Sequence, residues 1–212
     1  IISGLVGSEM CIRDRLNGAG RFNRVNADAA AAVLALFNSP IKKDNLTSFP
    51  GMLRRQSTLY SDANLTLVED YAHHPTEIDA LIECLKKSEP EKELIIVFQP
   101  HRYSRTRQFK NAFVNSLQAA DRVFLLPVYA AHEIPVDGGD TSALRQAFSS
   151  QIPVELEMSF SGMQVLAGAL CGTPAQIAFV GAGDIGEFAA AFVSWLRPDI
   201  SRTVSYTHLR AH

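Results

Sequence analysis

The sequence predicts an α/β domain in which a mostly parallel sheet lies between two layers of helices. Three observations support this fold class. Short apolar runs alternate with segments of helical periodicity between about residues 65 and 195. The run at residues 94–98 is apolar throughout, which is typical of a strand covered on both faces. The segments between the runs are long enough for right-handed helical crossovers, so the expected architecture is a three-layer, Rossmann-like domain.

Each element is predicted from its apolar spacing and from the turn residues that flank it. Strands are expected at residues 65–68, 94–98, 123–126 and 177–180, with an edge strand at 154–156. Helices are expected at residues 75–88, 107–119, 161–169 and 184–195, and another helix begins at the 137–140 turn and continues through Phe148. A separate helix at about residues 23–38 precedes the alternating region and ends at Ser39 and Pro40.

A change of pattern near residues 40–50 predicts a domain boundary. We expect residues 16–44 to be the remnant of a preceding domain and residues 45–200 to form the α/β domain. Residues 1–15 and 201–212 show no clean period, and they resemble translated sequencing-adaptor read-through. The alternative is that these two segments are frayed natural termini.

The composition predicts a cytoplasmic protein without a strong global field. With 47% hydrophobic residues the chain can form a core, and a formal net charge of −2 would not recruit nucleic acid or an anionic membrane. Its three cysteines share no disulfide or metal-ligand spacing, which favours a reducing compartment. No apolar run approaches the roughly 20 residues of a membrane span. Any affinity for anions must therefore be local, and the oligomeric state is left open.

The first candidate segment, residues 70–77, lies between a predicted strand and a predicted helix and reads D-Y-A-H-H-P-T-E. Pro75 suits the first helical position, and Glu77 can bond the free amide at the helix start. Such a helix N-terminus favours anions, and Asp70 can hold Mg²⁺ or a ribose hydroxyl. The alternative is a solvated loop with a good cap. The concentration of polar and aromatic groups favours a functional role.

The second candidate segment follows the most apolar strand and reads Q-P-H-R-Y-S-R at residues 99–105. Arg102 and Arg105 lie three residues apart, so one helical turn would place both guanidinium groups on the same side. The planar fork of arginine matches a carboxylate or a phosphate with two hydrogen bonds. The alternative is a pair of ordinary surface arginines. The position at the tip of a buried strand favours an anion site.

A third segment, Gly181 to Gly186, matches the string G-x-G-x-x-G between a strand and a helix. A dinucleotide fold would need a further strand with an acidic residue about 20 residues later, and the sequence does not continue in that way. We interpret the glycines as a tight strand–helix turn. The sequence also contains no Walker A loop, no G-x-S-x-G elbow and no zinc spacing.

Taken together, these segments resemble the Mur ligase family. The strings at residues 70–77 and 98–103 (F-Q-P-H-R-Y) are highly specific, and the second separates members that add L-alanine from murein-recycling tripeptide ligases. The resemblance runs from about residue 20 to residue 197. It implies that residues 45–200 are the Mur ligase C-terminal domain and that residues 16–44 are the last helix of the central ATP-binding domain. Supporting marks are G-R-F-N-R-V-N-A at 20–27, F-P-G at 49–51, Arg54 and Arg55, V-Y-A-A at 128–131, and G-A-G-D-I at 181–185.

The resemblance implies a reaction in peptidoglycan precursor synthesis. ATP phosphorylates the lactyl carboxylate of UDP-N-acetylmuramate, and the amine of L-alanine attacks the acyl phosphate. ATP and Mg²⁺ are the implied cofactors, and UDP-N-acetylmuramate, L-alanine and ATP are the implied partners. Catalysis in such a reaction comes mostly from positioning and from charge neutralisation.

The resemblance also assigns site residues. Arg55, with Arg54, would reach the ATP phosphates, Asp70 would contact the ribose, and Asn26 with its neighbours would contact adenine. Members often have histidine where Phe22 stands, so a polar contact is lost although a ring can still stack. The implied ATP-binding residues are Phe22, Asn23, Asn26, Arg54, Arg55 and Asp70. The implied amino-acid-binding residues are Tyr71, His73, Arg102 and Arg105, of which His73, Arg102 and Arg105 are also catalytic; no metal ligand is assigned.

The family's UDP-sugar-binding domain, its phosphate-binding loop and most of its Mg²⁺ ligands have no counterpart in this sequence. We therefore expect this chain alone to be inactive. Three alternatives remain open. They are a murein-recycling tripeptide ligase of the same family, a stand-alone nucleotide- or dinucleotide-binding module that uses the glycine segment, and a non-catalytic α/β scaffold.

Overall fold

The computed structural model describes residues 21–37, 39, 52–170 and 173–196. The chain divides into two compact units, residues 1–52 and residues 53–212. The two terminal segments, the turn at 49–51 and Cys171 lie outside the described residues. Expectations about them stay predictions.

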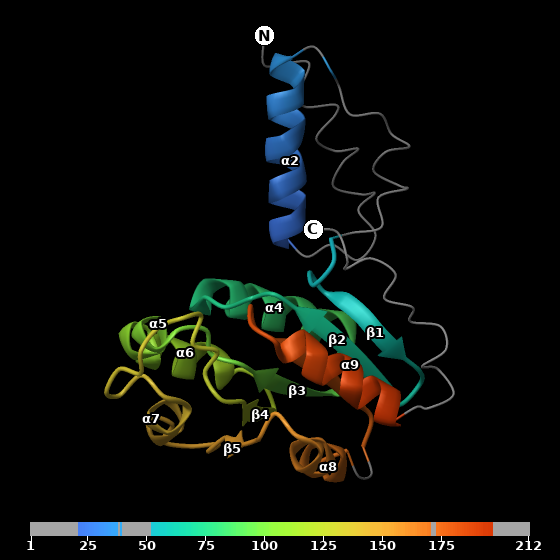
Figure 1. The fold of residues 1–212 in the computed structure, drawn as a ribbon. Coiled ribbons are helices and arrows are strands. Elements are labelled where there is room, and N and C mark those ends of the chain that lie inside the picture. Colours follow the sequence, from blue (N-terminus) through green and yellow to red (C-terminus); the bar gives the residue numbers. More distant parts are fainter. Residues whose placement is uncertain (1–20, 38, 40–51, 171–172, 197–212) are drawn as a thin grey trace, which may run out of the picture. The chain divides into compact units, whose positions relative to one another are not determined.

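A six-stranded sheet forms the centre of the second unit, in the order β1-β2-β6-β3-β4-β5 (Figure 1). Every neighbouring pair is parallel except β1 and β2, which are antiparallel, and this confirms the predicted mostly parallel sheet. The sequence did not indicate β1, because its side chains are half polar and partly exposed at the sheet edge. The strands are β1 Ser57–Ser61, β2 Leu65–Asp70, β3 Glu93–Phe98, β4 Arg122–Leu125, β5 Val154–Glu155 and β6 Ala175–Val180.

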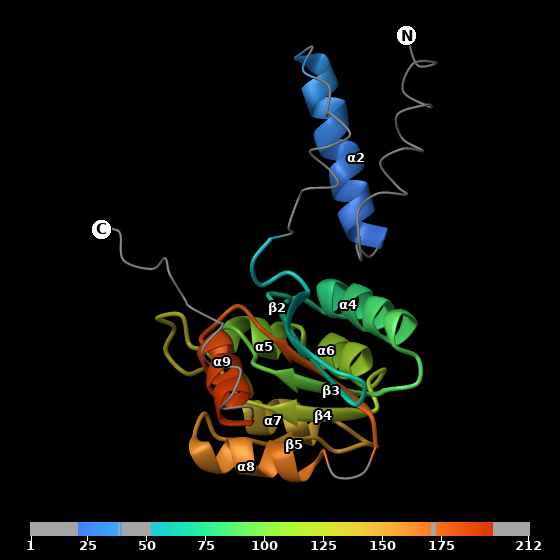
Figure 2. The same cartoon turned by 90° about the vertical axis from the view of Figure 1, so that its right-hand side faces the viewer.

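Helices cover both faces of the sheet, as predicted (Figure 2). Successive side chains of β3 enter opposite layers: Ile96 and Phe98 belong to the core under α4, α6 and α7, whereas Ile95 and Val97 belong to the core under α8 and α9. Because both faces are buried, the strand has no polar alternation. The helices are α4 Pro75–Ser88, α5 Tyr103–Gln108, α6 Lys110–Leu117, α7 Thr141–Gln146, α8 Phe160–Gly168 and α9 Ile185–Leu196.

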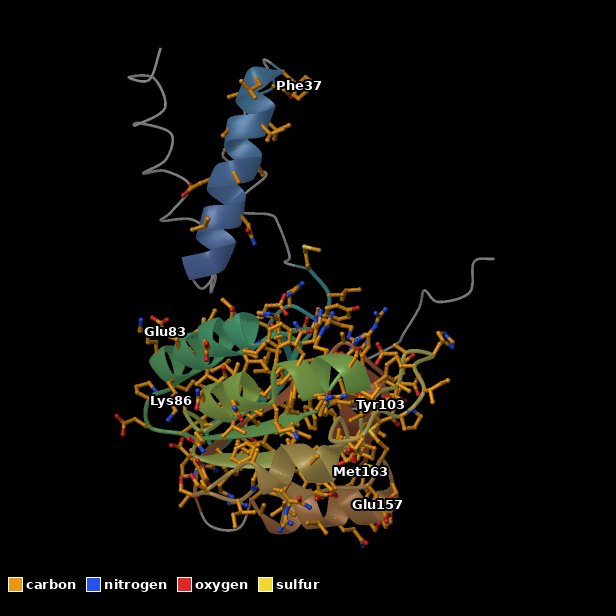
Figure 3. All side chains as sticks on the ribbon, turned by 90° about the vertical axis from the view of Figure 1, so that its left-hand side faces the viewer. Phe37, Glu83, Lys86, Tyr103, Glu157 and Met163 are labelled. Atoms are coloured by element: carbon orange, nitrogen blue, oxygen red, sulfur yellow. The ribbon has the colours of Figure 1, made fainter. Side chains whose placement is uncertain are left out.

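The first unit contributes α2, Arg21–Leu36, close to the helix expected at residues 23–38. The large apolar side chains that the structure describes on it are exposed, Leu36 to 81%, and Phe37 just beyond the helix is also exposed (Figure 3). A helix with such a surface needs a packing partner to be stable in water. The described residues do not identify that partner, so the assignment of residues 16–44 to a central domain stays a prediction.

The helix predicted at residues 107–119 is wrong in its limits. Two helices occupy this region, and they meet at Phe109, whose φ of −103° and ψ of 16° depart from helical values. Phe109 keeps its apolar role, since its ring packs 4.8 Å from the ring of His74 and 6.5 Å from that of Phe113. The first helix begins earlier than predicted because the Arg102 carbonyl accepts hydrogen bonds from the amide and the hydroxyl of Thr106.

The central strand β6 should dominate the stability of the second unit. Phe179 is fully buried, with ring centroids 6.3 Å from Phe188 and 5.8 Å from Phe192. We expect Phe179→Ala to lower the free energy of unfolding by about 3–5 kcal/mol, measured by urea denaturation. The same substitution at Phe160, which is 53% exposed and touches Trp195, is the control and should cost less than about 1.5 kcal/mol. Equal losses would contradict this assignment of the core.

Candidate functional site

Three loops leave the sheet side by side because three parallel strands end in register. Asp70 of β2 and Phe98 of β3 both pair with Val180 of β6, which lies between them. The loops that follow therefore start at one edge of the sheet, and they contain both predicted segments and the glycine turn. Ligands of open α/β sheets bind at the carboxyl ends of the strands. The structure thus brings both candidate segments to the same edge of the sheet.

The start of α4 is capped as predicted. Pro75 is the first helical residue, and the Glu77 carboxylate accepts hydrogen bonds from the amides of His73 at 2.9 Å and His74 at 3.2 Å. His74 also serves the cap, because its Nδ1 accepts from the amide of Thr76 at 3.3 Å. The two adjacent histidines therefore differ: His74 stabilises the helix end, and His73 remains available to the site.

His73 is held with one ring nitrogen facing the backbone. Its Nδ1 lies 3.0 Å from the carbonyl oxygen of Tyr71, and since a carbonyl only accepts, Nδ1 carries the proton in the neutral ring. That tautomer leaves Nε2 as a hydrogen-bond acceptor. The His73 ring centroid lies 5.5 Å from that of Tyr71 and 5.8 Å from that of His101. The first loop is thus in contact with the second.

Arg102 has a strained backbone and a free side chain. Its φ is 71°, and the amide donates to the carbonyl of Tyr129 at 2.8 Å, which holds this conformation. A non-glycine residue in this region costs of the order of 1–3 kcal/mol, and such strain clusters at functional sites. The exposed guanidinium makes no hydrogen bond or ion pair with the residues that the structure describes. It is available to a ligand.

In the second loop, two buried nitrogen atoms have no partner within the described part of the chain. They are Nη1 of Arg105 and Nδ1 of His101. The His101 ring stacks on Tyr129 at 5.5 Å, and burial, then the positive charge of Arg105, lowers the pKa of His101. Buried polar atoms are nearly always paired in folded proteins. An anion with acceptor oxygens would satisfy Arg105.

The two arginines predicted to face ATP differ in their surroundings. Arg54 donates from Nε to Glu69 Oε1 at 2.7 Å and from Nη2 to the carbonyls of Gly181 and Gly183, both at 3.0 Å. Its Cζ also lies 4.9 Å from the Tyr71 ring centroid. Arg55 makes a looser ion pair, with Nη1 3.8 Å from Glu77 Oε1, and its Cζ lies 5.6 Å from the Tyr71 ring centroid. Arg54 therefore braces the fold, while Arg55 can move toward a ligand.

Asp70 is an anchor for the segment that follows residue 53. It is 2% exposed, and its two carboxylate oxygens accept hydrogen bonds from the amides of Gln56 at 2.9 Å and Ala72 at 2.7 Å. Burial raises the pKa of Asp70, and these two hydrogen bonds oppose the rise. Gln56 has a positive φ of 50°, which the bond to Asp70 helps to hold. The predicted contact of Asp70 with a ribose stays a prediction.

The glycine segment forms a tight turn into α9, in agreement with our interpretation. A Cβ on Gly183 would lie 2.5 Å from Gln99 Oε1 and 2.5 Å from Tyr129 Cγ. The chain's own side chains thus fill the space that glycine leaves open. In a dinucleotide fold that space admits the pyrophosphate. The alternative of a dinucleotide module gains no support from this geometry.

Several residues of the site were not predicted from sequence. Glu133 accepts hydrogen bonds from the hydroxyl and amide of Ser104 at the start of α5, and these bonds lower the pKa of Glu133. Tyr129 lay in a recognised string, but its stacking on His101 had no signal in the sequence. Gln99 was part of the second segment and received no role. No local sequence pattern could have found contacts between residues so far apart in the chain.

Other predicted contacts lie elsewhere or stay predictions. The side chains of Phe22 and Asn23 lie outside the described residues, and Asn26 is exposed on α2. Within the described ranges, no group of three or more His, Cys, Asp or Glu side chains could hold a metal ion. Over the same residues, none of the helices is both long and apolar enough to cross a membrane.

Comparisons with known proteins agree with the geometry. UDP-N-acetylmuramate–L-alanine ligase from Hydrogenovibrio crunogenus is 38% identical over 185 residues, which are 82% of this chain and 40% of that protein. The ligase of the same name from Christiangramia forsetii is 36% identical over 175 residues, 82% of this chain and 38% of that protein. This chain therefore spans about 40% of the length of these curated relatives.

Solved structures show the same fold. UDP-N-acetylmuramate–alanine ligase from Thermotoga maritima matches with a TM-score of 0.66 and 26% identity, over 85% of this chain and 39% of that one. A murein peptide ligase from Psychrobacter arcticus matches with a TM-score of 0.56 over 82% of this chain and 36% of that one, and its 18% identity supports the fold alone. The family model for the glutamate ligase domain of Mur ligases matches residues 54–195. On this match, which covers both candidate loops and the glycine turn, the chain belongs to the Mur ligase family.

Proposed function

We propose that this chain is the C-terminal part of a UDP-N-acetylmuramate–L-alanine ligase and that the edge of its sheet binds the amino acid. The observation that carries the proposal concerns two arginines of one loop: the buried Nη1 of Arg105 has no partner among the described residues, and Arg102, three residues earlier, is exposed. Two guanidinium groups match the α-carboxylate of an amino acid. The relatives at 38% and 36% identity carry the name of that reaction.

The reacting amine would meet His73. The amine of L-alanine attacks the carbonyl carbon of an acyl phosphate, the C–N bond forms, phosphate leaves with its oxygen, and the amine loses a proton. Nε2 of His73 is the acceptor that the neutral tautomer leaves free, so we assign the proton to it. Tyr71 packs edge-on against His73 and limits the rotation of the ring. This assignment places the base next to the carboxylate-binding arginines.

ATP would approach from the side of Arg54 and Arg55, which follow the expected domain boundary. Arg55 is the residue we assign to the phosphates, since Arg54 is already bonded to Glu69 and to two carbonyls. Mg²⁺ supplies charge neutralisation in phosphoryl transfer in general. Among the described residues, no cluster of His, Cys, Asp or Glu side chains fits the ion. We propose that its ligands and the phosphate-binding loop belong to the preceding part of a longer protein.

A hybrid ligase tests the function. This chain would replace the matching C-terminal part of the Hydrogenovibrio crunogenus relative, and phosphate release would be measured with UDP-N-acetylmuramate, ATP and L-alanine. We expect turnover that depends on L-alanine, and Arg105→Lys should raise the KM for L-alanine about tenfold or more because the two-pronged contact is lost. Arg107→Lys, on an exposed residue of α5, is the matched control. A folded hybrid without L-alanine-dependent turnover would overturn the proposal, and the isolated chain should give none.

Substitutions of Arg54 and Arg55 should have different effects, the first on stability and the second on ATP binding. Arg54→Met leaves the buried Glu69 carboxylate without its cation and should lower the free energy of unfolding by about 2–3 kcal/mol. Arg55→Met should change it by less than about 0.5 kcal/mol, because its ion pair is loose and partly exposed. In the hybrid ligase, Arg55→Met should raise the KM for ATP about tenfold. Similar losses of stability in both variants would refute the assignment.

His101 should make stability fall in mild acid. Its folded pKa lies below the ordinary value, because burial and Arg105 disfavour the charged ring. As the pH falls below about 6.5, His101 therefore takes up a proton in the unfolded chain before it does so in the folded chain. The free energy of unfolding then decreases until the pH has passed below the folded pKa of His101. Urea denaturation at pH values from about 8 to 5 should show this slope, and His101→Gln should reduce it. An unchanged slope in the variant would argue against a neutral His101.

A further inference from the structure

We propose that Gln99 is a positioning residue for the amino-acid site: its amide bonds to Asp184 and Ile185 of the glycine turn and thereby fixes the loop that carries Arg102 and Arg105. The inference rests on the proposed function, because it concerns how the two arginines are presented to the carboxylate. Gln99 touches no reacting atom in this scheme. It acts through the backbone that follows it.

The Gln99 side chain is buried and bonded at both ends of its amide. It is 2% exposed, its Nε2 donates to Asp184 Oδ1 at 2.6 Å, and its Oε1 accepts from the amide of Ile185 at 3.0 Å. The backbone amide of Gln99 donates to the carbonyl of Val180 at 2.9 Å. These three hydrogen bonds fasten Gln99 to the last residue of β6, to the turn and to the start of α9, and Nε2 makes a longer contact with Met158 Sδ at 4.0 Å. The residue has no freedom to rotate without breaking one of them.

The loop beyond Gln99 is fixed by a second set of contacts. Tyr129 donates from its amide to the carbonyl of Pro100, and its carbonyl accepts from the amide of Arg102, both at 2.8 Å. The ring of Tyr129 also closes over Gly183, where an added Cβ would come within 2.6 Å of the Tyr129 Cβ. Gln99 and Tyr129 therefore hold the loop from its two sides. The glycine turn is their common support.

The glycine turn is also tied to the first loop. Arg54 donates to the carbonyls of Gly181 and Gly183 and lies over the ring of Tyr71. A continuous set of contacts therefore runs from Tyr71 through Arg54 and the turn to Gln99. We infer that this set fixes the distance between the amine side of the site at His73 and the carboxylate side at Arg102. A small shift of the turn would move one loop against the other.

The chemistry at position 99 requires a group that both donates and accepts. Glutamine meets this requirement, because its nitrogen faces a carboxylate and its oxygen faces a backbone amide. Glutamate has the same shape but would place an oxygen against Asp184 Oδ1, where two carboxylates repel. Exchanging the two groups, Gln99→Glu with Asp184→Asn, restores both hydrogen bonds with the donor on the other side. This exchange tests the role of the hydrogen bond while the sizes of the two side chains stay nearly the same.

The first test uses this chain itself and needs no ligand. The amide signals of residues 101–105 and 181–185 would be followed by ¹⁵N–¹H NMR in wild type, Gln99→Glu and the double variant, with thermal unfolding recorded in parallel. We expect Gln99→Glu to shift both groups of signals and to lower Tm by about 5 °C. In the double variant, the signals and the Tm should return most of the way to their wild-type values. Asp184→Asn alone keeps an acceptor for Gln99 and is the mild control. If the signals of residues 101–105 do not move in Gln99→Glu, the proposal is wrong.

The second test uses the hybrid ligase. Gln99→Glu should raise the KM for L-alanine about tenfold and leave the KM for ATP within about twofold. In the double variant, the KM for L-alanine should return toward its wild-type value. If Gln99→Glu does not fold, Asp184→Ala cuts the same hydrogen bond and should raise the KM for L-alanine about threefold. An unchanged KM for L-alanine in folded variants would overturn the positioning role. A wild-type hybrid that is folded but inactive would instead overturn the proposed function, and the NMR result would still decide the role of Gln99.

Discussion

The register of three parallel strands is the constraint on which the site depends. Because β6 lies between β2 and β3 and all three end at the same level, their loops must share one edge. The loop of the middle strand has little room, since both neighbours place side chains over it. Glycine at residue 183 is what the close approach of Gln99 and Tyr129 requires. Glycine at this position is thus a consequence of crowding by a side chain of the second candidate segment and one of the loop after β4.

Backbone strain gathers at the same edge. Among the described residues, six other than glycine have a positive φ. Of these, Arg54, Gln56 and Arg102 lie in or beside the predicted segments, and Ala131 and His132 follow Tyr129 in the neighbouring loop. Each such residue costs of the order of 1–3 kcal/mol, and its conformation persists only where the surroundings hold it. Asp70 holds Gln56, and Tyr129 holds Arg102 through its carbonyl. The buried cores on both faces of the sheet supply the stability that this geometry consumes.

The sequence predicted the parts of this structure that local rules determine. The cap formed by Pro75 and Glu77, the buried strand at 94–98 and the meeting of the two loops all follow from neighbouring residues and from strand topology. The break at Phe109 and the edge strand β1 were missed, because tertiary packing overrides weak local preference there. The bracing role of Arg54 was missed for another reason: its partners lie up to 129 residues away in the chain, and no spacing rule reaches them.

The electrostatics of the edge explain why it suits one anion. The chain as a whole carries a formal charge of −2, yet burial and then the charges of Arg105 and Arg102 lower the pKa of His101. A carboxylate placed between the arginines would offset their charge, and the pKa of His101 would then rise toward its ordinary value. Binding and protonation are therefore linked, and the linkage is reciprocal. A neutral His101 adds no third positive charge beside Arg102 and Arg105, which favours the proposed binding of a single carboxylate.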